Sequence, residues 1–166
     1  MENKDFIFKQ DWKNDGMLKW HNAKTIALYM QLCNDRNTCD LSKYDMFCAF
    51  SNEQFEQNRK TIRPLREGEK YVAFGTGVYG TRDGIEKYLA FSRSIGKRIT
   101  EECDPQEVYC YEYNNYESCI AYDGDVDAIR LVADYWGWDT AKRIKRFSAF
   151  YPVESLMSDN HRLPKR

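Results

Sequence analysis

The sequence is poor in the residues that most often build metal and nucleophilic sites. It has two histidines, His21 and His161, far apart in the chain, and its six cysteines include no Cys-x-x-Cys pair. Zinc sites usually combine closely spaced Cys and His ligands, so we expect no metal and no cofactor. No Ser-His-Asp or Cys-His grouping is visible either, so the sequence names no catalytic residue and leans against an enzyme.

Long apolar runs are also missing. No segment approaches the roughly 20 consecutive apolar residues that a membrane-spanning helix needs, and the first 15 residues lack the apolar core of a signal peptide. We therefore expect a cytoplasmic protein with no membrane partner and with mostly free, buried thiols.

Net charge is nearly absent, at −1, which argues against a general polyanion binder, because non-specific nucleic-acid affinity comes chiefly from neutralised phosphates. The charges are nevertheless segregated along the chain. Residues 99–129 hold nine acidic residues and neither Lys nor Arg, and a basic cluster follows at Lys142, Arg143, Lys145 and Arg146. We expect one acidic and one basic side.

What the sequence does contain suits a globular fold. The 166 residues are 42% hydrophobic and 31% charged, with an excess of aromatic residues that includes 12 tyrosines. No repeat or linker divides the chain. The expected fold is a single α+β domain over residues 1–166, with a small, mainly antiparallel sheet of about four strands covered by helices, and with loosely ordered ends at 1–15 and 150–166.

Periodicity predicts the elements of this fold. Helices are expected within 17–35, from Ser51 to about Ile62, from the residues after Gly80 to about Glu102, over 126–136, and over 140–147. Ser51-x-x-Gln54 matches a capping box at the start of the second helix, and Gly137 should end the fourth. Strands are expected over 44–50 and 71–74.

The stretch after the second predicted strand is rich in glycine, with the spacing Gly75-x-Gly77-x-x-Gly80 between a strand and a helix. Dinucleotide-binding loops share this spacing, but a second βαβ unit and the acidic residue about twenty positions on are missing. A structural turn is therefore the favoured interpretation. The alternative is a nucleotide or signalling-nucleotide site; its candidate ligand residues are Gly75, Thr76, Gly77, Gly80, Thr81 and Arg82.

A tyrosine-rich segment follows the long helix. Alternation predicts a β-hairpin with strands 107–113 and 116–122, joined by a turn at Asn114-Asn115. One side of the ribbon would carry tyrosines, and Glu112 would face Glu117 on the other. Either a helix covers the tyrosine face or the ribbon binds a partner with a basic surface. The candidate partner-binding residues are Tyr109, Tyr111, Tyr113, Tyr116, Glu112 and Glu117.

The last predicted helix is basic. Lys142, Arg143, Lys145 and Arg146 would surround it, with Ile144 and Phe147 pointing inward. A solvated face is the default interpretation, and a contact with nucleic acid is the weaker alternative.

Three segments of the sequence are also similar to segments of other proteins: CAFSNEQF (48–55), FGTGVYGTRDGIEKY (74–88) and DPQEVYCYEYNNYE (104–117). They resemble small hypothetical proteins of bacteriophages and prophage-bearing gut bacteria, a family with no activity or ligand residues to carry over. The resemblance implies a phage accessory protein that binds and blocks a host component. The leading hypothesis is therefore a non-enzymatic binding protein that acts through protein–protein contact.

Overall fold

The computed structural model describes residues 24–115, 124–147 and 151–158. The chain divides into two compact units, Cys33–Lys97 and a second made of Met1–Leu32 with Arg98–Arg166. We call these the sheet unit and the helical unit. Both divisions fall inside helices, α3 (Lys24–Asn37) and α5 (Arg82–Glu102).

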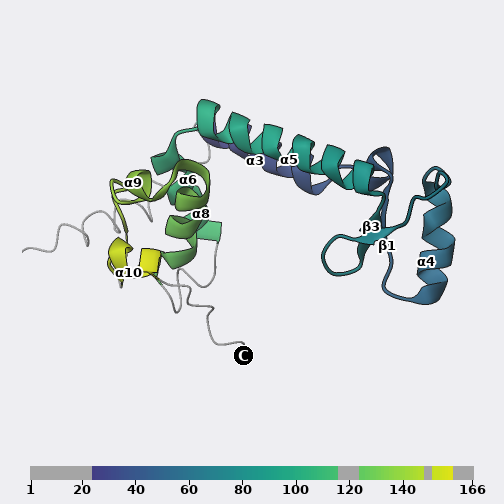
Figure 1. Ribbon diagram of the computed structural model, residues 1–166. Helices are drawn as coiled ribbons and strands as arrows, with labels where there is room; N and C mark the ends of the chain where they lie inside the picture. The colour runs from purple at the N-terminus through teal and green to yellow at the C-terminus, as the bar shows by residue number, and fades with distance from the viewer. Residues whose placement is uncertain (1–23, 116–123, 148–150, 159–166) are drawn as a thin grey trace, which may run out of the picture. The chain divides into compact units, whose positions relative to one another are not determined.

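The sheet unit is built on three short antiparallel strands, which are labelled in part in Figure 1. They are β1 (Met46–Cys48), β2 (Val72–Ala73) and β3 (Val78–Gly80). Strand β3 lies in the centre, with Phe47 and Ala73 both opposite Tyr79. The predicted α+β class with an antiparallel sheet is confirmed, although the described residues form three strands rather than about four.

Aromatic side chains fill the core of this unit. Phe47, Ala49 and Ile62 are buried, and Phe55, Tyr71 and Tyr79 pack against them. Phe55 comes from α4 (Asn52–Asn58), which lies beside β1 in Figure 1. Edge-to-face ring contacts of this kind add to the free energy gained by burial, so a small sheet is held by few but large side chains.

Helix α4 begins as its sequence predicts. The Ser51 hydroxyl oxygen accepts a hydrogen bond from the Gln54 amide, and the Gln54 side chain in turn accepts one from the amide of Phe50. The helix ends earlier than expected, at Asn58, and a 3-10 turn, η3 (Arg59–Thr61), follows it. Another 3-10 turn, η2 (Leu41–Tyr44), precedes β1.

Helix α5 confirms the helix predicted after the glycines. Thr81 caps its first turn, because the Thr81 hydroxyl oxygen accepts a hydrogen bond from the Gly84 amide at 3.0 Å. Tyr44 packs on the same helix through ring contacts with Tyr88 and Phe91. The first half of the helix thus packs against the residues that precede β1.

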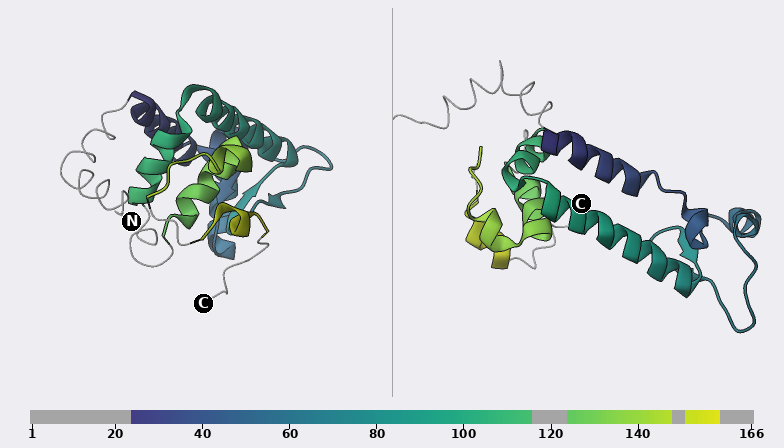
Figure 2. Two further views of the ribbon diagram at one scale, coloured as in Figure 1. Left: turned by 90° about the vertical axis from the view of Figure 1, so that its left-hand side faces the viewer. Right: turned by 90° about the horizontal axis from the view of Figure 1, so that it is seen from above.

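The helical unit contains the remaining described helices, two of them short. They are α6 (Pro105–Asn115), α8 (Val126–Trp136), α9 (Trp138–Ala141) and α10 (Val153–Ser158). Helices α6 and α8 pack against each other, as the views in Figure 2 also show. Their shared core includes Tyr109, Ile129 and Val132, none of which is accessible to solvent. The helix predicted over 126–136 is confirmed, as is its end at Gly137.

The predicted tyrosine hairpin is wrong. Its first strand and its turn are instead helix α6, which begins at Pro105. The Asp104 carboxylate accepts hydrogen bonds from the amides of Gln106 and Glu107 at 2.9 and 3.0 Å, which makes it an N-cap. Proline is well suited to the position after such a cap. The predicted second strand, 116–122, lies outside the described residues.

The predicted basic helix over 140–147 is also wrong. Helix α9 ends at Ala141, and residues 142–147 continue as turns, bends and irregular chain. Ile144 and Phe147 are nevertheless buried, as predicted. Within the described ranges, no helix is long and apolar enough to cross a membrane.

Candidate functional site

Phe50 is the most exposed large hydrophobic residue among those described, with 75% of its surface accessible. Its position is nevertheless defined. The Phe50 amide donates a 2.8 Å hydrogen bond to the Gln54 side chain. Its ring rests on Gly77, so closely that a Cβ added there would lie 2.3 Å from the ring. Specific contacts therefore fix an apolar ring in a solvent-exposed position.

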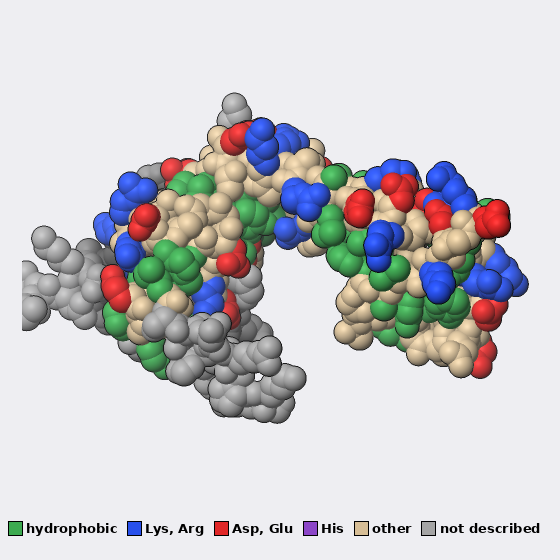
Figure 3. All heavy atoms as spheres, in the orientation of Figure 1, with side chains coloured by type: hydrophobic (Ala, Val, Ile, Leu, Met, Phe, Trp, Pro, Cys, Tyr) green, Lys and Arg blue, Asp and Glu red, His purple; other side chains and the backbone are tan. Residues whose placement is uncertain are grey.

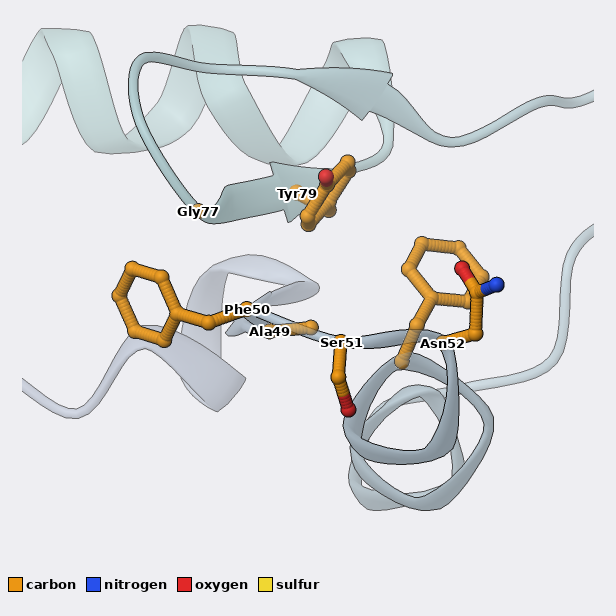
Figure 4. Close-up of a pocket in the computed structure, with 7 residues that line it drawn as sticks. Ala49, Phe50, Ser51, Asn52, Gly77 and Tyr79 are labelled. Carbon is orange, nitrogen blue, oxygen red and sulfur yellow. The ribbon is translucent and has the colours of Figure 1, made fainter.

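A hollow of about 300 Å³ lies beside this ring, and we call it the Phe50 hollow. Figure 4 shows Phe50 and Asn52 on opposite sides of the segment that joins β1 to α4, with Tyr79 reaching from β3. All the lining residues are uncharged: Ala49, Phe50, Ser51, Asn52, Phe55, Gly77 and Tyr79. The volume is at the small end of ligand pockets, so it suits one side chain better than a cofactor.

The hollow lies at the start of α4, where two hydrophobic side chains commonly pack against each other. A hydrophobic residue just before an N-cap usually packs on the residue four positions after the cap, in the contact called a hydrophobic staple. Here those residues are Phe50 and Phe55. Phe55 instead makes ring contacts with Phe47 and Tyr79, at centroid distances of 5.2 and 5.1 Å, and Phe50 lies over Gly77. The staple is open.

The polar groups of the hollow differ in their availability. The Ser51 hydroxyl oxygen accepts the hydrogen bond that caps α4. The Asn52 side chain is exposed, and no hydrogen bond joins it to another described residue. An amide both donates and accepts, so Asn52 can bond to the backbone of a bound chain at the edge of the hollow.

The glycines that suggested a nucleotide site do not form one loop between a strand and a helix. Gly75 and Gly77 both have positive φ, 75° and 72°, and form the hairpin turn between β2 and β3. The predicted direct passage from a strand through this loop into a helix is therefore wrong, because β3 intervenes. Thr76 lies between the two glycines in the same turn.

The other candidate nucleotide ligands lie at the start of α5. Gly80 is buried, and a Cβ there would come within 2.6 Å of the Met46 side chain. Thr81 is buried and caps the helix, whereas Arg82 is exposed. The structure thus separates the glycine turn from the helix N-terminus that a phosphate would use. Nucleotide binding by these residues stays a prediction.

The predicted partner-binding residues are divided by helix α6. Tyr109 and Tyr113 are buried in the core of the helical unit. Tyr111 and Glu112 are half-buried; the Tyr29 hydroxyl donates a 2.5 Å hydrogen bond to Glu112, and the Tyr29 and Tyr111 rings meet edge to face. Tyr116 and Glu117 lie outside the described residues. These side chains do not form the single ribbon face that was expected.

Tyr109 belongs to a buried polar network. Its hydroxyl donates to Asp125 at 2.8 Å and accepts from the amide of Phe147 at 2.8 Å, and Arg146 forms two hydrogen bonds with Asp125. Burial, and then the Asp125 charge, raise the pKa of Tyr109 far above its usual value. Every polar group named here has a partner, so the network stabilises the fold rather than offering a reactive group.

The four basic residues therefore have different surroundings. Arg146 is committed to Asp125, and its side chain is only 10% exposed. Lys142, Arg143 and Lys145 are exposed, and the Lys145 backbone pairs with the Gln106 side-chain amide at 2.7 and 3.1 Å. Nucleic-acid binding by this cluster stays a prediction, with three exposed cations rather than four.

Phe50 was not among the predicted site residues, because the run 44–50 was interpreted as one buried strand. Strand β1 ends at Cys48, and Phe50 lies beyond it. The sequence did contain a usable signal: Ser51 as an N-cap makes Phe50 the residue before the cap. What it could not show is that the ring lies on Gly77 and not on Phe55.

Within the described part of the chain, no group of three or more His, Cys, Asp or Glu side chains is arranged to hold a metal ion. Comparisons with protein-family models, with curated proteins and with solved structures find no match. The resemblance to phage proteins therefore stays a prediction, and the functional argument rests on the geometry of the Phe50 hollow.

Proposed function

We propose that this protein is a non-enzymatic binding protein, and that the Phe50 hollow is its protein-binding surface. The observation that carries the proposal is an aromatic ring that stays 75% exposed while its backbone and its face are both fixed. Burying a Phe side chain is worth about 1.5–3 kcal/mol relative to leaving it exposed. Most of that gain remains to be made when a partner covers Phe50.

The surroundings fit an interface centre. Aromatic anchors next to well-packed pockets carry much of the energy of protein–protein interfaces, and charged residues are depleted there. The hollow has such an anchor and an uncharged lining, with the half-buried rings of Phe55 and Tyr79 as its walls. We infer that the partner contributes an apolar side chain of about the size of one ring.

This proposal changes the expected partner chemistry. A basic partner was expected from an acidic tyrosine ribbon, and helix α6 replaces the described part of that ribbon. The hollow instead favours an uncharged partner segment, with an apolar side chain against Phe50 and a hydrogen-bonding group at the polar edge. The inhibitory role implied by the phage resemblance would be one outcome of such binding.

A comparison of two matched variants tests the proposal. Phe50→Ser removes the exposed ring, and Tyr151→Ser removes another aromatic residue, 50% exposed, from the other unit. The immobilised full-length chain should retain specific proteins from a cell lysate. We expect Phe50→Ser to lower their recovery at least tenfold, equivalent to about 1.4 kcal/mol, and Tyr151→Ser to leave it unchanged.

The backbone carbonyl of Tyr151, which accepts a hydrogen bond from Arg146, is kept in the control variant. Equal recovery by the wild type and by a folded Phe50→Ser protein would reject the Phe50 hollow as the binding surface. Circular dichroism of each variant establishes that it is folded.

A further inference from the structure

The next inference rests on the proposed function and names the kind of partner. We propose that the Phe50 hollow binds a proline-rich segment in the polyproline II conformation, and that a Lys or Arg residue next to the prolines pairs with Glu53 at the edge of the hollow. The hollow would then recognise a short, rigid stretch of chain.

The walls of the hollow suit proline. Three aromatic rings line it: Phe50 precedes α4, Phe55 lies within α4, and Tyr79 lies on β3. Aromatic-lined grooves are the usual sites for polyproline II segments, whose conformation is already ordered before they bind. Phe50 is also fixed in advance, because its amide is bonded to the Gln54 side chain and its ring lies on Gly77. Little conformational entropy is therefore lost on either side.

The polar groups of the hollow suit a chain that has carbonyl groups but few amides. Figure 4 places Phe50 at one end and Asn52 at the other, with Tyr79 between them. Polyproline II has no internal hydrogen bonds, so its carbonyls stay free, and the exposed Asn52 amide can donate to one of them. Acceptors are scarcer, since the carbonyls of Ser51 and Gly77 already accept hydrogen bonds. Proline has no amide that would need one.

Charge complementarity supplies the residue next to the prolines. The lining is uncharged, so the segment inside the hollow is uncharged too. Glu53, next to Asn52, is exposed; hydrogen bonds from its own backbone amide and from the Ser51 side chain lower its pKa, so it is ionised at neutral pH. No ion pair joins Glu53 to a described residue, whereas Glu56 is already paired with Arg59. Glu53 is therefore available to a cation of the partner.

The wider surface does not compete with this local contact. The face of the sheet unit seen in Figure 3 mixes acidic and basic side chains around hydrophobic ones, rather than carrying one sign. A mixed rim around an apolar centre is the usual composition of an interface.

Two fluorescent peptides test the proposal by anisotropy with the full-length protein. One has eight prolines followed by an arginine, and the other replaces the prolines by a Gly-Ser chain with a central phenylalanine. The proline peptide should bind at least tenfold more tightly. Phe50→Ser should weaken its binding at least tenfold, and Asn52→Ala about fivefold, as the loss of one hydrogen bond does. Tyr151→Ser should leave it unchanged.

A third peptide, with glutamine in place of the arginine, tests the pairing with Glu53. Glu53→Gln should weaken binding of the arginine peptide about threefold, a typical effect for an exposed ion pair, and leave the glutamine peptide unaffected. The control Glu67→Gln changes another exposed carboxylate of the sheet unit and should leave both peptides unaffected. An equal effect of Glu53→Gln on both peptides, or none on either, would overturn the pairing.

Equal binding of the proline and Gly-Ser peptides, or no binding of either at about 1 mM protein, would overturn the proline-rich segment as the partner. Capture of a lysate protein that depends on Phe50 would then still support the proposed function, and loss of that capture would reject both.

Discussion

At the scale of single residues, the structure shows how little space separates α5 from the turn before β1. The Cα of Gly84, in the first turn of α5, lies against the carbonyl group of Tyr44, and a Cβ added to Gly84 would be 1.9 Å from that oxygen. The obstacle is backbone, which cannot rotate away as a side chain could. Glycine is therefore required there by a close approach rather than by its φ angle.

This gives an expectation opposite to helix propensity. Glycine in a helix is about 1 kcal/mol less favourable than alanine, so Gly84→Ala would ordinarily stabilise α5. Here we expect the contact with Tyr44 to dominate and to lower the free energy of unfolding by about 1–3 kcal/mol, the usual cost of overpacking. Urea denaturation measures the difference, and a Gly84→Ala protein more stable than the wild type would contradict the packing described.

Glu69 illustrates a residue whose charge is tied to the fold. Arg63 donates two hydrogen bonds to its carboxylate, at 2.7 and 2.8 Å, and the Arg66 amide donates a third at 2.6 Å. The Arg63 hydrogen bonds, then that of Arg66, lower the pKa of Glu69 from 4.5 to about 2. Arg63 also contacts Asp45, whose φ of 52° is otherwise unfavourable for a residue with a side chain.

Because this pKa is lower in the folded than in the unfolded protein, ionised Glu69 stabilises the fold fully above about pH 4.5, and the stabilisation is lost as the pH falls toward 2. We expect Glu69→Gln to lose stability at pH 7 and to show a shallower fall in the unfolding free energy between pH 5 and 2. The exposed neighbour Glu67 is the control, and Glu67→Gln should follow the wild type. Parallel pH curves for Glu69→Gln and the wild type would contradict this account.

At the scale of elements, helix α6 forms although its composition favours a strand, because the residues at its start favour a helix. Tyrosine and valine favour strands, and the segment 107–113 alternates as a half-buried strand would. Asp104 and Pro105 decide otherwise, because the carboxylate satisfies two amides at the helix start and proline has no amide to satisfy. Tyr109 and Tyr113, four residues apart, then share the buried side of the helix.

We therefore expect Asp104→Ala to lower the free energy of unfolding by about 1 kcal/mol, the typical cost of losing an N-cap. Asp104→Asn keeps a side-chain oxygen that accepts from the same amides, so it should cost only a few tenths of that value. Thermal denaturation of the two variants separates the lost cap from the lost charge. Equal destabilisation of both variants would contradict the capping role.

The elements that were predicted correctly have signals that agree with one another. Helix α8 has its apolar stripe and Gly137 at its end, α5 has its stripe and Thr81, and α4 has Ser51 with Gln54. The glycine turn was harder, because a hairpin turn and a phosphate loop both need positive φ and both attract glycine. Only the pairing of β2 with β3, which is a long-range property, decides between them.

At the scale of the whole molecule, the division into two units cannot be recognised from the amino-acid composition. Domain boundaries usually lie in polar linkers, whereas here both divisions fall inside amphipathic or mixed helices, at residues 32–33 and 97–98. Helical periodicity continues through each division, so sequence reasoning had nothing to detect. The expectation of one domain over the whole chain stays a prediction.

The candidate site could not be predicted from the sequence for a similar reason. Its lining comes from three places in the sequence, the end of β1, the start of α4 and the β2–β3 hairpin. Their convergence depends on strand order, which no local pattern reports. The residue scale supplied only the capping box beside Phe50, and the exposure of the ring follows from the fold.

Photochemical cross-linking at position 50 tests the central claim most directly. With p-benzoylphenylalanine in place of Phe50 in the full-length chain, we predict defined protein adducts on irradiation in a cell lysate. The same probe in place of Tyr151 should give no defined adduct. No defined adduct at position 50, from a folded protein, would contradict the claim that Phe50 is the centre of a protein-binding surface.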